Sequence, residues 1–119
     1  MARILLAEDD DQMRAFLTRG LRRAGHAVDA CADGEAALAR SHEAEYDLLL
    51  ADVVMPGIDG IELARRMTAH QPGVRVMFIT GFAAVALQDD RLGPRRPRVL
   101  SKPFHLRHLI AEVEALLSQ

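Results

Sequence analysis

Two short apolar runs in this chain end abruptly in acidic residues. Ile4–Ala7 runs into Glu8–Asp11, and Leu48–Ala51 runs into Asp52. Apolar runs of this length, bounded by polar residues, are typical of strands that are buried on both faces of a parallel sheet. Ligands of an open parallel sheet gather at the carboxyl ends of its strands, where the strand order reverses. We therefore expect an acidic pocket at this edge, suited to a hard divalent cation with oxygen ligands.

The rest of the chain continues an alternation of strands and helices. Apolar residues recur at helical spacing after the predicted strands, while Asp, Gly and Pro mark the helix ends. Asp59-x-x-Glu62 fits a capping box, and Gly25 fits a helix stop. The strands are expected at 4–7, 27–31, 48–51, 74–79 and 99–100, and the helices around 13–21, 33–41, 59–67, 82–88 and 106–117, with a loop over 89–97.

Five strand–helix units predict an α/β fold. They indicate a flavodoxin-like, doubly wound parallel sheet, (βα)5, with helices on both faces and right-handed crossovers. The strand order typical of this fold is 2-1-3-4-5, with the switch point between the first and third strands, which are the two that end in acid. With 119 residues, the chain is expected to form one domain over 1–119, with no output domain.

Composition and charge exclude several classes of protein. The net charge of −2 provides no field that attracts nucleic acid. No stretch reaches the roughly 18 consecutive apolar residues of a membrane helix, and Met1–Arg3 leads into a strand rather than a signal peptide. Cys31 is the only cysteine, so an internal disulfide is excluded. We expect a cytoplasmic protein without membrane or nucleic-acid partners.

Four motifs, each at the end of a predicted strand, resemble those of a known family. The family is the receiver domain of bacterial two-component response regulators, which is CheY-like, and the resemblance covers the whole chain. The motifs are Glu8-Asp9, Asp52–Gly60, Thr80-Gly81 and Lys102-Pro103-Phe104.

The resemblance implies a phosphorylation site. Asp52 occupies the phosphoacceptor position, where a carboxylate attacks phosphorus and holds the phosphoryl group as an acyl phosphate. The donor would be a histidine kinase or a histidine phosphotransferase. Mg²⁺ would offset the negative charge, held by Glu8, Asp9, Asp52 and the backbone carbonyl of Val54. Such a protein catalyses only its own phosphorylation and dephosphorylation and is not otherwise an enzyme.

Further roles follow from the same resemblance. Thr80 would donate its hydroxyl to a phosphoryl oxygen, and Lys102 would supply a point charge to the same group, or pair with Asp52 in the resting state. The Lys102–Pro103 bond is expected to be cis. Many receivers carry an aromatic switch residue at the position of Val99, so we expect Phe82 or Phe104 to report the state instead.

A closer resemblance is to the CpdR group of single-domain regulators. It rests on 59–66, 77–87 and 99–103. This group primes the ClpXP protease while unphosphorylated, which implies binding to the ClpX unfoldase and a role in cell-cycle proteolysis. A phosphorelay intermediate, or a CheY-like regulator of another protein target, would share every catalytic residue and differ only in its partner.

Two other classes of protein use related architecture and are disfavoured by particular residues. Haloacid-dehalogenase enzymes also use a strand-end aspartate with Mg²⁺, but they need a second acid two residues later, where this chain has Val54. A flavodoxin-like electron carrier must hold a phosphate in its first loop, and the acids of Glu8–Asp11 would repel one.

Overall fold

A computed structural model describes residues 1–82, 86, 88–93 and 97–119 of the chain. The five strands form one parallel sheet in the order β2-β1-β3-β4-β5, which confirms the predicted fold. None of the helices in the described ranges has the length and apolar character needed to cross a bilayer. The elements are β1 (Arg3–Ala7), α1 (Asp11–Arg23), β2 (Ala27–Cys31), α2 (Gly34–Ser41), β3 (Leu48–Asp52), α3 (Gly60–His70), β4 (Arg75–Thr80), the 3-10 helix η1 (Asp90–Leu92), β5 (Arg98–Ser101) and α5 (Leu106–Leu117).

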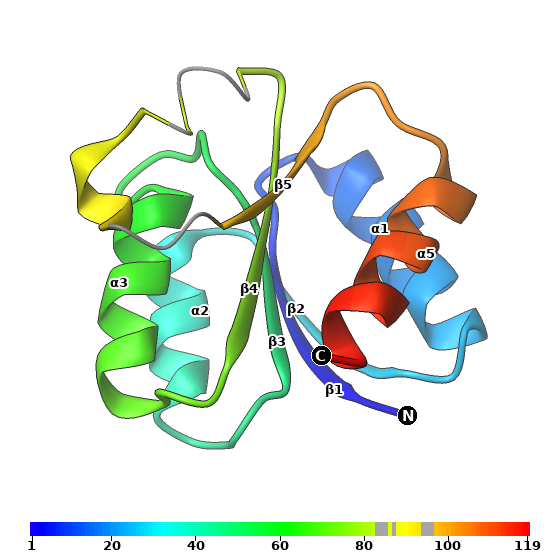
Figure 1. Cartoon of the computed structure of the whole chain (residues 1–119), viewed down its shortest axis with the longest axis horizontal. Coiled ribbons are helices and arrows are strands. Elements are labelled where there is room, and N and C mark those ends of the chain that lie inside the picture. The colour runs from blue at the N-terminus through cyan, green and yellow to red at the C-terminus, as the bar shows by residue number, and fades with distance from the viewer. Residues whose placement is uncertain (83–85, 87, 94–96) are drawn as a thin grey trace.

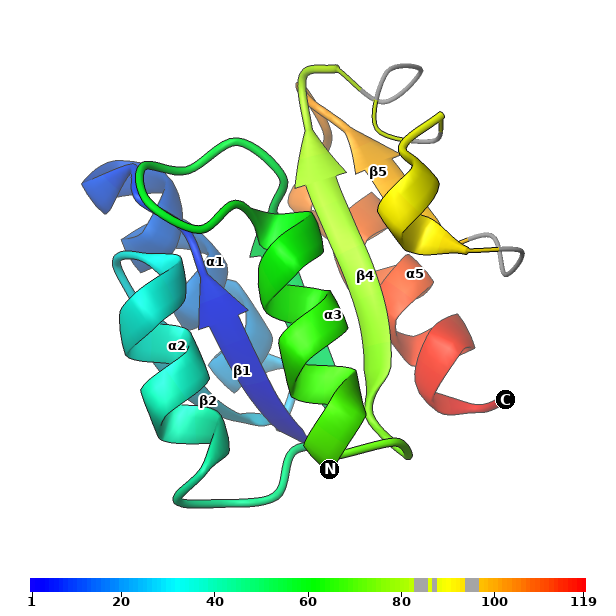
Figure 2. The ribbon, with the colours of Figure 1, turned by 90° about the vertical axis from the view of Figure 1, so that its left-hand side faces the viewer.

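Helices cover both faces of the sheet. Helices α1 and α5 lie on one face of the sheet, and α2 and α3 lie on the other (Figure 1). In Figure 2, α2 and α3 lie in front of the sheet. Side chains alternate between the faces along each strand, so β1 sends Ile4 and Leu6 toward α1 and α5, but Leu5 and Ala7 toward α2 and α3. The central strand β3 is buried along its whole length. Two hydrophobic clusters therefore hold the sheet rigidly between the helix layers.

Aspartates begin three of the helices. The carboxylates of Asp10, Asp33 and Asp59 accept a hydrogen bond from the backbone N–H three residues later, which caps α1, α2 and α3. At the predicted stop after α1, Gly25 has a φ of +100°, in the region that favours glycine.

The reciprocal half of the predicted capping box is wrong. The carboxylate of Glu62 does not reach back to the N–H of Asp59. It accepts from Arg65 Nη2 at 2.6 Å and from Arg66 Nε at 2.7 Å, further along the same helix. Two guanidinium groups offer a carboxylate stronger, charge-assisted hydrogen bonds than one amide does, which explains the difference.

The segment between β4 and β5 differs from the predicted loop. Most of the predicted helix over 82–88 lies outside the described residues. The expected loop over 89–97 contains η1, whose Arg91 donates to both carboxylate oxygens of Asp59 at 3.1 and 2.8 Å. Arg91 also donates to the carboxylate of Asp89, the residue just before η1. Because Asp59 caps α3, the bonds from Arg91 to Asp59 attach η1 to the start of that helix.

Candidate functional site

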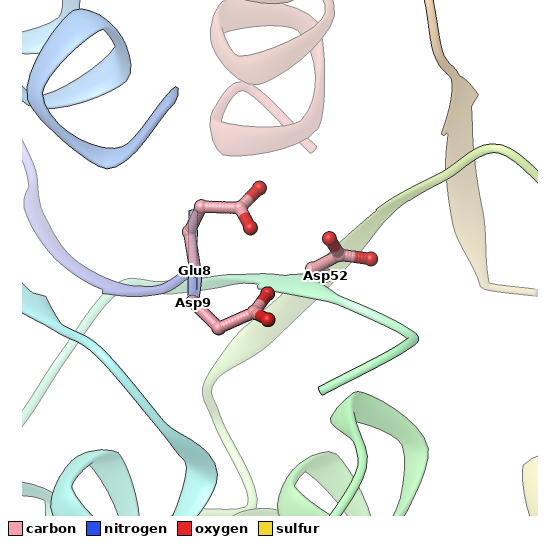
Figure 3. A group of neighbouring side chains, drawn as sticks. All are labelled: Glu8, Asp9 and Asp52. Carbon is pink, nitrogen blue, oxygen red and sulfur yellow. The ribbon is translucent and has the colours of Figure 1, made fainter. Parts of the chain in front are cut away.

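The ends of four parallel strands bring the candidate residues to one edge of the sheet. Glu8 and Asp9 directly follow β1, and Asp52 ends β3. Figure 3 shows the carboxylates of Glu8 and Asp9 directed toward the side on which Asp52 lies, and one oxygen of each of the three acids lies within 4.8 Å of the others. The register between β1 and β3 explains why these acids lie close together, because Ala7 pairs with Ala51, the residue before Asp52. Thr80 ends β4, and Lys102 follows β5.

Burial differs sharply among the three acids. Glu8 is fully buried and Asp52 is 6% exposed, whereas Asp9 is exposed to solvent. The pKa of Glu8 is raised to about 7, chiefly because the side chain is buried. The nearby charge of Asp52 also raises this pKa, whereas hydrogen bonds from the Asp10 amide and from Lys102 lower it. Near neutral pH, Glu8 is therefore partly protonated.

Lys102 balances part of this negative charge. Its Nζ donates to Asp52 Oδ2 at 2.7 Å and to Glu8 Oε1 at 3.1 Å. Burial lowers the pKa of Lys102, but its bonds to the two carboxylates outweigh this effect, and the net shift is upward. The ammonium group is therefore held in its charged form beside Asp52. The Lys102–Pro103 peptide bond is cis, as predicted.

Both oxygens of Asp52 are held by neighbouring groups. Oδ1 accepts the backbone N–H of Val54 at 3.1 Å, and Oδ2 accepts from Lys102. These contacts set the orientation of the carboxylate at the end of a strand that is buried along its whole length. A carboxylate oriented in this way at the carboxyl edge of the sheet is suited to nucleophilic attack on an electrophile that arrives from solvent.

Thr80 connects the ends of β4 and β5. Its side chain is fully buried, and its Oγ accepts the backbone N–H of Phe82 at 3.0 Å. Its carbonyl oxygen accepts the backbone N–H of Lys102 at 2.8 Å. The hydroxyl proton can still be donated, so a new acceptor in the pocket would act on the backbone that leads to Phe82.

The residues predicted for the switch or partner surface, Phe82, Val99 and Phe104, lie in different surroundings. Phe82 is 63% exposed at the end of β4. Val99 packs against the cluster beneath α2 and α3, whereas Phe104 packs against the opposite cluster, beneath α1 and α5. Val99, at the position where many relatives carry an aromatic ring, is thus part of the core packing of one face.

One residue at the site was not identified from the sequence. The Nη1 atom of Arg14 donates to the carbonyl oxygen of Glu8 at 3.0 Å, and its Nη2 bonds the Asp11 carboxylate. Arg14 therefore ties the acidic loop after β1 back to α1. The spacing of Asp11 and Arg14 on one helix face predicts their pairing, but no local pattern predicts the contact with Glu8.

The donor set of this edge fits a divalent cation. Three carboxylates surround one space, and carboxylate oxygens are the protein ligands that Mg²⁺ prefers. Two of them, on Glu8 and Asp52, share the single charge of Lys102. The exposed carboxylate of Asp9 adds negative charge at the open side, which leaves an excess that a cation would neutralise.

Comparison with known proteins identifies the class that this fold and site define. Residues 4–114 match the family model of the response regulator receiver domain. The chain therefore belongs to the receiver domain family of two-component response regulators.

Individual relatives are similar over nearly the whole chain. The response regulator receiver protein CpdR of Brucella abortus (strain 2308) is 56% identical over 117 residues, which cover 98% of each chain. The receiver domain of the hybrid histidine kinase CckA is 36% identical, with a TM-score of 0.83, over 97% of this chain and 98% of that one. TrrA of Thermotoga maritima, solved in complex with Mg²⁺-BeF, is 27% identical, with a TM-score of 0.86, over 98% and 99% of the two chains.

The raised pKa of Glu8 predicts a pH dependence of Mg²⁺ binding. A protonated carboxyl group must release its proton before it can serve as a metal ligand. With a pKa of about 7, Glu8 is mostly protonated at pH 6 and mostly ionised at pH 8. We expect Mg²⁺ affinity, measured by isothermal titration calorimetry, to be about tenfold weaker at pH 6 than at pH 8. A Glu8→Gln variant should bind weakly at both pH values.

The raised pKa of Glu8 also makes the free energy of unfolding of the metal-free protein depend on pH. The pKa of Glu8 is higher in the folded chain than its ordinary value of 4.5, so the folded state binds the proton more tightly than the unfolded state does. The stabilising contribution of protonated Glu8 to the free energy of unfolding is fully present below about pH 4.5 and is lost as the pH rises through about 7. The contribution should be absent in Glu8→Gln, as urea unfolding of both proteins across this range can measure.

Proposed function

We propose that this chain is a CpdR-like single-domain response regulator whose partner binding is controlled by phosphorylation of Asp52. The observation that carries the proposal is the placement of Asp52. Its carboxylate lies at a strand end, 2.7 Å from the Nζ of Lys102 and within 4.8 Å of ligand oxygens from Glu8 and Asp9. The relationship to CpdR extends over 98% of each chain, which agrees with a receiver domain that spans nearly all of the given sequence.

The phosphoryl donor would be a phosphohistidine of a histidine kinase or a histidine phosphotransferase. One carboxylate oxygen of Asp52 attacks phosphorus in line with the leaving nitrogen. The P–N bond breaks, a P–O bond forms, and the leaving nitrogen of the imidazole takes up a proton from solvent. Like charges would oppose the approach of a phosphoryl group to this acidic pocket. Phosphorylation therefore requires positive charge at the site.

Magnesium is the cofactor that we propose for this step. Glu8, Asp9, Asp52 and the backbone carbonyl of Val54 would hold it. Bound Mg²⁺ would supply charge neutralisation and a template for the phosphoryl oxygens. The protein's own ammonium, Lys102, would transfer one of its hydrogen bonds from the Asp52 carboxylate to a phosphoryl oxygen.

Thr80 provides a route from the phosphoryl group to the surface. Its Oγ accepts from the N–H of Phe82, and its hydroxyl proton is available to a phosphoryl oxygen. Formation of that bond would draw the Thr80 side chain, and with it the backbone of Phe82, toward the pocket. The phosphoryl group can shift the equilibrium only by the free energy with which it favours the new arrangement.

We further propose the ClpX unfoldase as the partner and the cytoplasm as the location, with no membrane or nucleic-acid partner. The 56% identity with CpdR and the motifs shared with that group support this assignment. The alternative is a phosphorelay intermediate or a CheY-like regulator of another target, and the 36% identity with the receiver domain of CckA is the observation that favours it.

Binding of purified ClpX tests the partner. Immobilised wild-type protein should retain ClpX and lose it when Mg²⁺ and beryllofluoride, an acyl-phosphate mimic, are added. Asp52→Ala, which cannot hold the mimic, should retain ClpX under both conditions. Equal retention by wild type under the two conditions would contradict the proposal. Absence of ClpX binding, together with rapid passage of the phosphoryl group to a histidine phosphotransferase, would support the phosphorelay alternative.

A slow loss of the phosphoryl group is also predicted. Val54 and Phe82, two residues after Asp52 and Thr80, are apolar, and their side chains are 56% and 63% exposed. Such side chains cannot orient a hydrolytic water by hydrogen bonds. We expect Val54→Asn to shorten the lifetime of the acyl phosphate about fivefold or more. An acyl-phosphate lifetime of seconds in the wild type that is unchanged in Val54→Asn would contradict this prediction.

A further inference from the structure

The loop that follows the phosphoacceptor strand is attached to a helix by a residue outside the site. Residues 53–59 connect β3 to α3. Near the far end of this loop, the N–H of Ile58 donates to Glu35 Oε1 at 3.0 Å. Glu35 lies in the first turn of α2. A charged acceptor of a backbone N–H makes one of the stronger kinds of hydrogen bond.

Two glycines show how closely the loop and this helix approach each other. Gly57 has a φ of +75°, and a Cβ there would lie 2.0 Å from Glu35 Oε1 and 2.6 Å from Oε2. A Cβ on Gly34 would lie 2.5 Å from Ile58 Cγ1 and 2.7 Å from the Ile58 carbonyl oxygen. The Glu35 carboxylate therefore lies directly over the turn of the loop, where only glycine leaves room for it.

The near end of the same loop contacts the phosphoacceptor. The N–H of Val54 donates to Asp52 Oδ1 at 3.1 Å. The loop closes on itself where the N–H of Gly60 donates to the carbonyl of Val53 at 3.0 Å. A displacement at Ile58 would therefore pass along a short closed segment to Val54, four residues earlier.

We propose that Glu35 is a positioning residue for the phosphorylation site. By holding the N–H of Ile58, Glu35 fixes the loop so that Val54 presents its N–H to Asp52 and its carbonyl to the cation. Glu35 acts through the loop and contacts neither Asp52 nor the reacting phosphoryl group. The role in phosphorylation rests on the proposed function, whereas the effect on the loop belongs to the protein alone.

Three variants separate the hydrogen bond from the charge. Glu35→Ala removes both, and Glu35→Gln removes the charge but keeps an oxygen that accepts the Ile58 N–H. Glu43→Ala is the matched control, because Glu43 is an exposed glutamate just after α2 whose removal costs the same charge. The readouts are amide hydrogen exchange of Ile58 and Val54 in metal-free protein, Mg²⁺ affinity by calorimetry, and the phosphorylation rate from phosphoramidate at saturating Mg²⁺.

If Glu35 positions the loop, the three measurements should respond differently to its removal. In Glu35→Ala, the amides of Ile58 and Val54 should exchange about fivefold faster or more, and the Kd for Mg²⁺ should rise by about the same factor. The rate at saturating Mg²⁺ should stay within about twofold of wild type, since the bound cation would hold the loop through the carbonyl of Val54 and Lys102 still holds Asp52. Glu35→Gln and Glu43→Ala should resemble wild type in the exchange of Val54 and in Kd.

The opposite results would overturn the proposal. If Glu35→Gln weakened Mg²⁺ binding as much as Glu35→Ala did, charge and not the hydrogen bond would be responsible. Unchanged exchange of Val54 in Glu35→Ala would show that the loop does not depend on Glu35. Failure of the wild type to bind Mg²⁺ would refute the proposed function instead, and the exchange of Val54 would still decide whether Glu35 holds the loop.

Discussion

Replacement of Asp52 by asparagine should abolish phosphorylation of the protein. The amide keeps the shape of the side chain and an oxygen that can accept the N–H of Val54, but it is a far weaker nucleophile than a carboxylate. We expect the rate of phosphoryl transfer to Asp52→Asn to fall by a factor of about 10³ or more. Intact-protein mass spectrometry after incubation with a phosphorylated histidine phosphotransferase measures the modified fraction.

A neighbouring acid provides the control for this experiment. Asp10 lies in the same acidic loop as Glu8, but its carboxylate caps α1 by accepting the N–H of Met13 at 2.9 Å. Asparagine is an equally good capping residue, so Asp10→Asn should fold and accept the phosphoryl group at nearly the wild-type rate. Stable modification of Asp52→Asn, or equal loss in both variants, would mean that Asp52 is not the acceptor.

The second large effect expected is on stability, from replacement of Gly60 by alanine. Gly60 is the first residue of α3 and lies close to the backbone at the end of β3. A Cβ on Gly60 would lie 2.2 Å from the carbonyl oxygen of Asp52, 2.9 Å from its carbonyl carbon and 3.1 Å from Val53 Cα. All three are backbone atoms, which cannot turn away as a flexible side chain can. We expect a loss of about 3 kcal/mol or more in the free energy of unfolding.

Urea unfolding of two glycine variants tests this expectation. Gly73 lies in the turn before β4, and a Cβ on it would meet no atom within 4 Å. Gly73→Ala should therefore leave the free energy of unfolding within about 1 kcal/mol of wild type. If Gly60→Ala were as stable as Gly73→Ala, the close packing of α3 on β3 would be contradicted. The metal affinity of Gly60→Ala should also fall, because Asp52 itself would be displaced.

The strands could be predicted because their sequence signal is local. Runs such as Leu48–Ala51 are apolar at every position, as strands covered on both faces must be, and all five predicted strands occur in the sheet. Their boundaries shift by a residue, since hydrogen bonding extends β3 to Asp52 and β4 to Thr80. Aspartate caps were equally predictable, because a cap is a contact between residues three apart.

The predictions were weaker where competing contacts come from other elements. The capping box failed because Arg65 and Arg66 compete for the carboxylate of Glu62. The expected loop after residue 88 contains η1, stabilised by a pairing of Arg91 with Asp59 across 32 positions of sequence. No pattern within a short window records that pairing.

The sequence alone was sufficient to predict the parallel sheet and to identify the acids that reach its carboxyl edge. The strand order followed from the pattern of five strand–helix units. The physical reason is that hydrophobic periodicity acts within a few residues, and strand order then carries the ends of distant segments to one place. Only the tertiary structure decided the finer properties of the site. The burial that raises the pKa of Glu8, the two hydrogen bonds of Lys102, and the hold of Glu35 on Ile58 arise between residues that are 23 to 94 positions apart. Such contacts depend on distances that no local pattern encodes.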